Sequence, residues 1–253
     1  MLSKNQLKFD FEKLISAINR KGDIKTVEFQ PVYLNMMKAQ QDRIKEICGN
    51  QFDRIEARGS LISISIAYTR EEIQFINHLK PDGLRDTEQW NKYANAYYLL
   101  NDQLNIIADK IAKKVEGIPI LATLEGIAGK VNHVSDYFPQ TVSHRHIAEL
   151  AGIGWRGKNQ LIIHPKFSCA IRFVSIITPY QYEADNKSDK NSCEDCRACL
   201  DVCNFLEKQS ILKDYREQCR RYINQLNLDA DVCGKCIKAC VNNSKFSSNF
   251  NLK

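Results

Sequence analysis

No stretch of the sequence approaches the ~20 consecutive apolar residues that a membrane-spanning helix requires. The first residues, MLSKNQLKFDFEKL, mix charged and apolar side chains, so they lack the apolar core of a signal peptide. A strong charge excess is also missing, because 36 basic residues against 30 acidic ones leave a formal charge of only +6. This mild excess tolerates an anionic partner without requiring one. We therefore expect a cytoplasmic protein with no membrane partner.

Cysteine, by contrast, is concentrated in one part of the chain. Of ten cysteines, eight lie between residues 193 and 240. In a reducing compartment such a group is more often a set of metal ligands or redox groups than of disulfides. Cys48 and Cys169 have no partner motif and are expected to be buried thiols. The predicted metal ligands are Cys193, Cys196, Cys199, Cys203, Cys219, Cys233, Cys236 and Cys240.

The spacing of these eight residues favours two [4Fe–4S] clusters. The first four follow the pattern C-x2-C-x2-C-x3-C, in which three cysteines bind one cubane and the fourth binds the other cluster. Two structural zinc sites are the alternative, but zinc usually takes C-x2-C pairs separated by a longer loop. By the crossover rule, one cluster takes Cys193, Cys196, Cys199 and Cys240. The other takes Cys203, Cys233 and Cys236, and the lone Cys219 is available to complete it.

The rest of the chain predicts an α+β fold with an α/β body. Apolar residues at helical spacing predict helices near 4–19, 35–47, 86–116 and 143–151. Short apolar runs predict strands near 27–32, 61–67, 118–121, 160–163 and 170–177. We expect one large domain over residues 1–182, an exposed polar linker over 183–191 and a small cysteine-rich domain over 192–253.

A glycine-rich segment, AGIGWRGKN, follows the predicted helix 143–151. Its glycines allow the backbone to approach a bulky or flat ligand, and Trp155 and Lys158 offer a stacking face and a charge. The same glycines could instead serve a tight turn from helix to strand. The segment matches neither a Rossmann nor a P-loop pattern.

The glycine segment, the following strand Leu161-Ile162-Ile163, the complete cysteine order and the lone Cys219 in QCRRYI together resemble the epoxyqueuosine reductase family and its shorter relatives. The resemblance covers about residues 60–241. It implies a nitroreductase-like, cobalamin-binding domain joined to a ferredoxin-like module with two [4Fe–4S] clusters, and it assigns Cys219 to the second cluster. The corrinoid would be lined by Gly152, Gly154, Trp155, Gly157, Lys158 and Asn159.

The family places a catalytic aspartate in a D-x-x-P segment upstream of the glycine motif. Asp136-Tyr137-Phe138-Pro139 matches that segment if two residues are inserted before the motif, which makes Asp136 the candidate proton donor. An aspartate beside a proline is also a common turn residue. Tyr137 and His144 are the alternative proton donors.

The resemblance implies an oxidoreductase of queuosine biosynthesis that reduces an epoxide in tRNA. Longer family members add a helical-repeat domain that helps to hold tRNA, whereas Ser143-His144-Arg145 resembles the shorter relatives, so the expected substrate is a small molecule or tRNA. Basic residues around the cysteines, Lys208, Lys213, Arg216, Arg220, Arg221, Lys235 and Lys238 among them, could attract an acidic electron donor such as flavodoxin or ferredoxin.

The sequence is also compatible with three other functions. The chain could be a ferredoxin-type electron-transfer protein or a corrinoid-reducing activator, with clusters but no small-molecule substrate of its own. It could hold a flavin where the family holds cobalamin. A nucleic-acid-binding iron–sulfur protein is a third possibility, although the mild positive charge supports it poorly.

Overall fold

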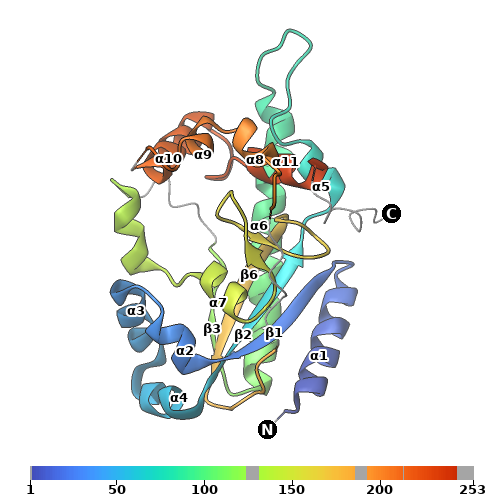
Figure 1. Ribbon diagram of the computed structural model, residues 1–253. Coiled ribbons are helices and arrows are strands. Elements are labelled where there is room, and N and C mark those ends of the chain that lie inside the picture. Colours follow the sequence, from blue (N-terminus) through green and yellow to red (C-terminus); the bar gives the residue numbers. More distant parts are fainter. Residues whose placement is uncertain (1, 124–130, 186–192, 213, 244–253) are drawn as a thin grey trace.

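A four-stranded antiparallel sheet forms the centre of the protein (Figure 1), for which a computed structural model describes residues 2–123, 131–185, 193–212 and 214–243. The strand order is β1-β2-β6-β3, so the two longest strands lie in the middle. The bounds are β1 Gly22–Glu28, β2 Ser60–Ala67, β3 Ile118–Ile120 and β6 Ile171–Thr178. Together with the helices on both faces, this sheet confirms the predicted α+β class.

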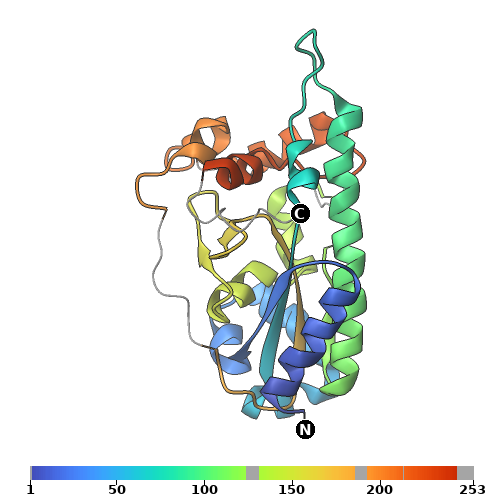
Figure 2. The ribbon, with the colours of Figure 1, turned by 90° about the vertical axis from the view of Figure 1, so that its right-hand side faces the viewer.

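Helices cover both faces of the sheet and create two apolar cores (Figure 2). On one face, Ile62, Ile64 and Ile66 of β2 pack against α6 (Thr87–Lys114) and α1 (Lys4–Ala17). On the other face, Leu61 joins a second core. That core is formed by α2 (Phe29–Leu34), α3 (Lys38–Cys48), α4 (Phe52–Arg58) and α7 (His144–Leu150). Because both faces are covered, the small residues Ser63 and Ser65 are buried as completely as the isoleucines.

The long helix α6 is close to the prediction of residues 86–116. It begins after Asp86, whose side chain accepts a hydrogen bond from the Gln89 N–H, an N-cap interaction that satisfies an otherwise unpaired donor. Its buried stripe includes Tyr97, Leu100 and Leu104. Among the described helices, none combines the length and the apolar character that crossing a bilayer demands.

The strand predicted at 27–32 is wrong. The chain is extended over Gly22–Glu28 and becomes helical at Phe29, where α2 begins. Phe29 and Tyr33, one helical turn apart, stack with their ring centroids 5.5 Å from each other, and both contact Phe52. This aromatic packing in the second core decides the conformation, whereas the β-branched residues of the segment favour a strand.

The remaining elements are short and surround the ends of the sheet. They are η1 (Gly49–Gln51), α5 (Arg70–Gln74), η2 (Val134–Gln140), β4 (Trp155–Arg156) and β5 (Ile162–Ile163). The cysteine-rich segment contains α8 (Ala198–Asp201), α9 (Asn204–Glu207), α10 (Tyr215–Leu226) and α11 (Lys235–Asn243).

The cysteine-rich segment packs directly on the body of the protein (Figure 1). Leu226, Val232 and Val241 belong to the same apolar core as β2 and α6. The indole N–H of Trp90, at the start of α6, donates a hydrogen bond of 3.0 Å to the Cys233 carbonyl. The domain boundaries themselves stay a prediction, but the two segments share a core.

The start of the predicted linker is anchored to the body. The Asp185 side chain is only 8% exposed and lies within 3.2 to 3.8 Å of the ammonium groups of Lys4, Lys8 and Lys25. It also accepts a hydrogen bond of 2.8 Å from the Thr26 N–H. The expectation of an exposed connection is therefore wrong at Asp185, and residues 186–191 lie outside the described residues.

Replacing Asp185 tests this anchor. Burial raises the pKa of the carboxyl, but the Thr26 N–H and the neighbouring lysines outweigh burial and hold the pKa below its ordinary value. Asp185→Asn should lower the free energy of unfolding at pH 7 by about 1–3 kcal/mol, because it leaves buried partners of a charged group unpaired. The depressed pKa means that this stabilisation is complete above about pH 3.9 and is lost as the pH falls through the folded-state pKa.

Urea titrations of both proteins between pH 7 and pH 3 measure the difference. Asp109→Asn is the matched control, because Asp109 is 58% exposed and its only ion pair in the described chain is a surface contact with Lys113. Equal unfolding free energies for Asp185→Asn and the wild type would contradict the proposed anchoring.

Candidate functional site

The first group of cysteine side chains comprises Cys193, Cys196, Cys199 and Cys240. Burial, and after it the neighbouring thiols of Cys240, Cys193 and Cys196, raises the pKa of Cys199 to about 11. Cys199 is carried by α8 and Cys240 by α11, and these two helices pack against each other. The four side chains are therefore neighbours although one of them is distant in the sequence.

The second group comprises Cys203, Cys219, Cys233 and Cys236. Burial, and then the thiols of Cys233 and Cys203, raises the pKa of Cys219 to about 12. The pKa of Cys236 is raised by burial first and then by Cys233, Cys219 and Cys203. The membership of both groups agrees with the crossover spacing, and Cys219 lies in the second group. Ligation of iron by these residues stays a prediction.

The donor set has the chemistry that cubane clusters need, namely four thiols in each of two neighbourhoods. In the part of the chain that the structure describes, no three thiol, imidazole or carboxylate groups are close enough to enclose a single ion. A cubane does not require such convergence, because each cysteine binds a different iron. Thiols with raised pKa values are protonated at neutral pH, so assembly of a cluster must release protons.

The glycine segment forms a tight hairpin between α7 and β5. Gly152 has a φ of +82°, and β4 pairs with β5 directly after Gly154. A Cβ atom on Gly154 would lie 2.1 Å from the Ile163 carbonyl oxygen, so only glycine fits there. The alternative role of a helix-to-strand turn is therefore present, and the lining of a corrinoid by this segment stays a prediction.

Lys158 of the same segment reaches the first cysteine group, and Asn159 contacts Cys169. The Lys158 ammonium donates hydrogen bonds of 2.6 Å to the Glu194 carbonyl and 3.0 Å to the Cys196 carbonyl. The Asn159 amide donates one of 3.3 Å to the sulfur of Cys169. The predicted cofactor segment and the first cysteine group therefore form one continuous site.

Asp136 lies in η2, which contacts α10 of the cysteine segment. Its carboxylate is exposed and accepts a hydrogen bond of 3.0 Å from the His133 N–H, so it caps its own turn. The structure thus shows the turn role for this residue, and a catalytic role stays a prediction. Residues 124–130, upstream of this segment, lie outside the described residues.

Glu217 and Arg220 of α10 tie the Asp136 segment to the second cysteine group. Glu217 is fully buried and accepts a hydrogen bond of 2.9 Å from the Val134 N–H. The Arg220 guanidinium contacts Glu217 at 2.7 Å and donates to the carbonyls of Val131 and Asn132 at 2.9 and 3.0 Å. Because Cys219 lies between these two residues in α10, one helix positions both a predicted cluster ligand and the predicted proton-donor segment.

His144 is poorly suited to donate a proton. Burial lowers the pKa of its imidazole to about 4. The Leu121 carbonyl acts on this pKa in the opposite direction, and the nearby charge of Arg172 adds a smaller lowering. Nε2 lies 3.0 Å from the Leu121 carbonyl and Nδ1 lies 2.9 Å from the Ser175 hydroxyl. The ring is neutral at pH 7, and its one N–H is directed at a backbone carbonyl.

Sequence reasoning missed a buried arginine among tyrosines. Arg172 of β6 donates to Asn101 at 3.0 and 3.1 Å and lies 4.2 Å from the ring centroid of Tyr97. Burial raises the pKa values of Tyr68 and Tyr93, which keeps both hydroxyls protonated. A Cβ atom on Gly234 would lie 2.8 Å from the Tyr93 ring, so this cationic cluster adjoins the second cysteine group. The signal was present in the sequence, because Arg172 interrupts an otherwise apolar strand.

Several of the basic residues expected to attract an electron donor are used inside the protein. The Lys238 ammonium donates to the carbonyls of Gln74 and Ile76, both at 2.8 Å. Lys235 contacts the Tyr222 hydroxyl, and Arg220 pairs with Glu217. Lys208 and Arg216 are exposed, whereas Lys213 lies outside the described residues.

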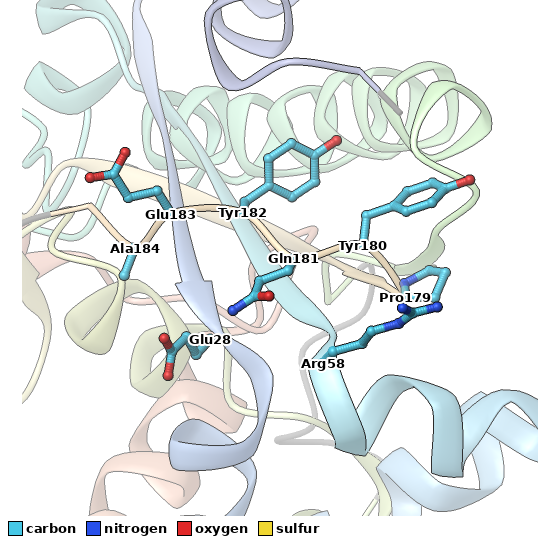
Figure 3. Close-up of a pocket in the computed structure, with 8 residues that line it drawn as sticks. All are labelled: Glu28, Arg58, Pro179, Tyr180, Gln181, Tyr182, Glu183 and Ala184. Carbon is cyan, nitrogen blue, oxygen red and sulfur yellow. The ribbon is translucent and has the colours of Figure 1, made fainter.

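One cavity of about 860 Å³ lies at the other end of the sheet (Figure 3). It is bordered by Glu28, Arg58 and residues 179–184. None of the predicted catalytic, cofactor or metal residues contributes to it, so it is separate from the site described above.

No protein-family model matches the sequence. Curated relatives do match, and the three described here are named epoxyqueuosine reductase. The protein of Pseudomonas aeruginosa is 27% identical over 137 residues, which are 54% of this chain and 36% of that protein. The Bacillus cereus protein is 39% identical over 62 residues, 24% of this chain and 16% of that protein. The Cyclobacterium marinum protein is 23% identical over 211 residues, 73% of this chain and 63% of that protein. The chain therefore covers less than two thirds of each of these relatives.

A solved structure shows the same fold. The epoxyqueuosine reductase from Streptococcus thermophilus superimposes with a TM-score of 0.52 and 20% identity, over 95% of this chain and 66% of that one. A selenomethionine-labelled epoxyqueuosine reductase gives a TM-score of 0.51 at 16% identity, over 98% and 68%.

The link between α10 and the Asp136 segment can be tested by hydrogen exchange. Glu217→Ala removes the acceptor of the Val134 N–H and the buried counter-charge of Arg220. Amide exchange at residues 131–136 should accelerate by about tenfold or more, the equivalent of one lost hydrogen bond. Glu207→Ala, which removes an exposed carboxylate from α9, is the control and should leave exchange in that segment unchanged. Unchanged exchange in Glu217→Ala would show that α10 does not hold the segment.

Proposed function

Because the chain is a relative of the epoxyqueuosine reductases that matches them over part of their length, we propose that it is an iron–sulfur, cobalamin-dependent reductase. One observation carries this proposal. The eight cysteines form two groups of four, and the glycine segment contacts the first group through Lys158. A site for electron delivery and a candidate site for the acceptor are thus adjacent.

In this proposal the body is the nitroreductase-like, cobalamin-binding domain, and residues 192–253 are a ferredoxin-like module. The protein is cytoplasmic in this proposal. The first cluster is held by Cys193, Cys196, Cys199 and Cys240, and the second by Cys203, Cys219, Cys233 and Cys236. When bound, the clusters and the corrinoid supply low-potential electrons and a strongly nucleophilic metal for reduction of an electrophilic substrate such as an epoxide.

The chain's own residues bind the cofactor, orient the cysteine loop and supply a proton to the substrate. The hairpin that requires Gly154 would hold the cofactor along the backbone of residues 152–157, where Trp155 offers an aromatic surface. Lys158 holds the loop of the first cysteine group against this hairpin. Asp136 holds the proton that the reduced substrate takes up, in a segment that Glu217 and Arg220 fix to α10.

The proposed substrate is epoxyqueuosine in tRNA or a small molecule with a similar electrophilic group. The proposed electron donor is a flavodoxin or ferredoxin, whose acidic surface would meet the exposed Lys208 and Arg216. The rival function is a ferredoxin-type electron-transfer protein or corrinoid-reducing activator, which shares the clusters but has no substrate of its own.

Anaerobic reconstitution measures the cofactors directly. The full chain should bind about eight irons and eight sulfides, since each cubane holds four of each. Cys219→Ala should reduce iron toward about four per chain, because the second cluster loses a ligand. Cys48→Ala is the matched control, because Cys48 is a buried thiol of the second core and belongs to neither group. Zinc in place of iron would contradict the proposal.

Adding cobalamin during reconstitution distinguishes the reductase from the electron-transfer protein. A reductase should retain about one corrinoid per chain after gel filtration, visible by absorbance, and should turn over epoxyqueuosine-tRNA or a small epoxide when reduced. Eight irons with neither corrinoid nor flavin would leave the electron-transfer protein as the better description. A bound flavin would identify the alternative cofactor.

The role of Asp136 is tested by Asp136→Asn in single-turnover reduction of an epoxide. Loss of a positioned proton donor should lower the rate by about 10²–10⁴-fold, with iron and corrinoid content unchanged. Asp42→Asn, at an exposed surface ion pair with Lys38, should keep the wild-type rate. A wild-type rate in Asp136→Asn would remove this residue from the catalytic assignment.

A further inference from the structure

The backbone between β5 and β6 holds Ser168 in an unusual conformation. Its φ is +51°, a left-handed value that is uncommon for residues other than glycine. Two hydrogen bonds enforce it, from the His164 N–H to the Ser168 carbonyl at 2.8 Å and from the Ser168 N–H to the His164 carbonyl at 3.0 Å. A conformation of this kind persists only where its surroundings impose it, and such residues gather at functional sites.

The strained turn aims the Ser168 hydroxyl at a predicted cluster ligand. Its Oγ lies 3.0 Å from the Sγ of Cys240, and Ser168 is fully buried. A cysteine that binds iron is a thiolate and has no proton to give, so Ser168 must be the donor when a cluster is bound.

Cys169, the next residue, also faces Cys240. Its thiol and its backbone N–H both lower the pKa of the Cys240 thiol, so both lie close to that sulfur. The Asn159 side-chain amide donates to the Cys169 sulfur, and the side-chain oxygen Oδ1 of the same residue accepts a hydrogen bond of 3.1 Å from the Leu161 N–H. With its sulfur accepting from Asn159, the Cys169 S–H is directed to Cys240. Cys169 was expected to be a buried thiol without a partner; it is buried, but it contacts a member of the first group.

The second cysteine group has a different environment. The pKa of Cys219 is raised by burial and then by the thiols of Cys233 and Cys203. At Cys233 the Lys235 backbone N–H opposes the effect of burial on the pKa. A buried side-chain hydroxyl at Cys240 in the first group and a backbone N–H at Cys233 in the second therefore make the surroundings of the two groups unequal.

We propose that Ser168 and Cys169 act as positioning residues that raise the reduction potential of the cluster bound through Cys240, making it the electron acceptor of the pair. This inference rests on the proposed function, because it requires the two clusters. A cluster gains negative charge on reduction, so donors to a ligand sulfur stabilise the reduced form more than the oxidised one.

The direction of electron flow follows from this asymmetry. The first group is the one that Lys158 contacts, so the more easily reduced cluster lies beside the glycine segment. Electrons that enter at the second cluster then move to the first, next to the site where they are used. The Asn159 amide acts through Cys169 in the same network.

The test is a redox titration of the reconstituted full chain, followed by electron paramagnetic resonance. Ser168→Ala and Cys169→Ala should each shift the potential of one cluster to a more negative value and leave the other unchanged. The double variant should show the larger shift. Cys169→Ser keeps a donor at this position and should restore a potential close to that of the wild type.

Two matched controls separate this effect from general disturbance of the fold. Ser63→Ala removes a fully buried hydroxyl that lacks a hydrogen-bond partner in the described chain, and Cys48→Ala removes a buried thiol. Both should keep the wild-type potentials. Unchanged potentials in Ser168→Ala and Cys169→Ala, or equal shifts of both clusters, would overturn the inference. A chain that holds no iron would overturn the proposed function as well, whereas eight irons with unchanged potentials would overturn this inference alone.

Discussion

The order of the cysteines along the chain is the constraint on which the rest of the site depends. Cys236 and Cys240 are four residues apart in α11, so their side chains lie on the same face, separated by about one helical turn of 5.4 Å. One belongs to the second group and the other to the first. A single helix therefore sets the separation of the two groups, and α8 must fold back against α11 to complete the first. The compactness of the module follows from this crossover.

The cysteine segment has little apolar core of its own. Its helices are short, and the apolar residues between them, such as Leu226 and Val232, pack into the core of α6 and β2. Trp90 and Tyr93 at the start of α6 contact the Cys233 carbonyl and Gly234. The body thus supplies the packing that the module lacks, and the same contacts bring the second cysteine group close to Arg172 and its tyrosines.

Much of this arrangement could be predicted from the sequence where a local pattern determines the structure. The stripe from Tyr97 to Ile111 predicts α6, and the Ile-Ser alternation predicts β2, because each pattern reflects a repeating backbone geometry. The cysteine spacing predicts the membership of both groups for the same reason. The prediction failed at 27–32, where stacking of Phe29 on Tyr33 outweighs strand propensity, and at Asp185, where three lysines distant in sequence converge.

The residues that sequence reasoning missed all act across large separations in the chain. Ser168 meets Cys240 across 72 residues, and Glu217 meets Val134 across 83. No periodicity records such contacts, because each depends on how two finished elements pack. The first contact ends at the predicted cluster ligand Cys240, and the second ends at Glu217, two residues before the predicted ligand Cys219. The body of the protein therefore contacts one group at a ligand sulfur and the other through the helix that carries a ligand, so the two groups lie in different electrostatic surroundings although their thiols are the same.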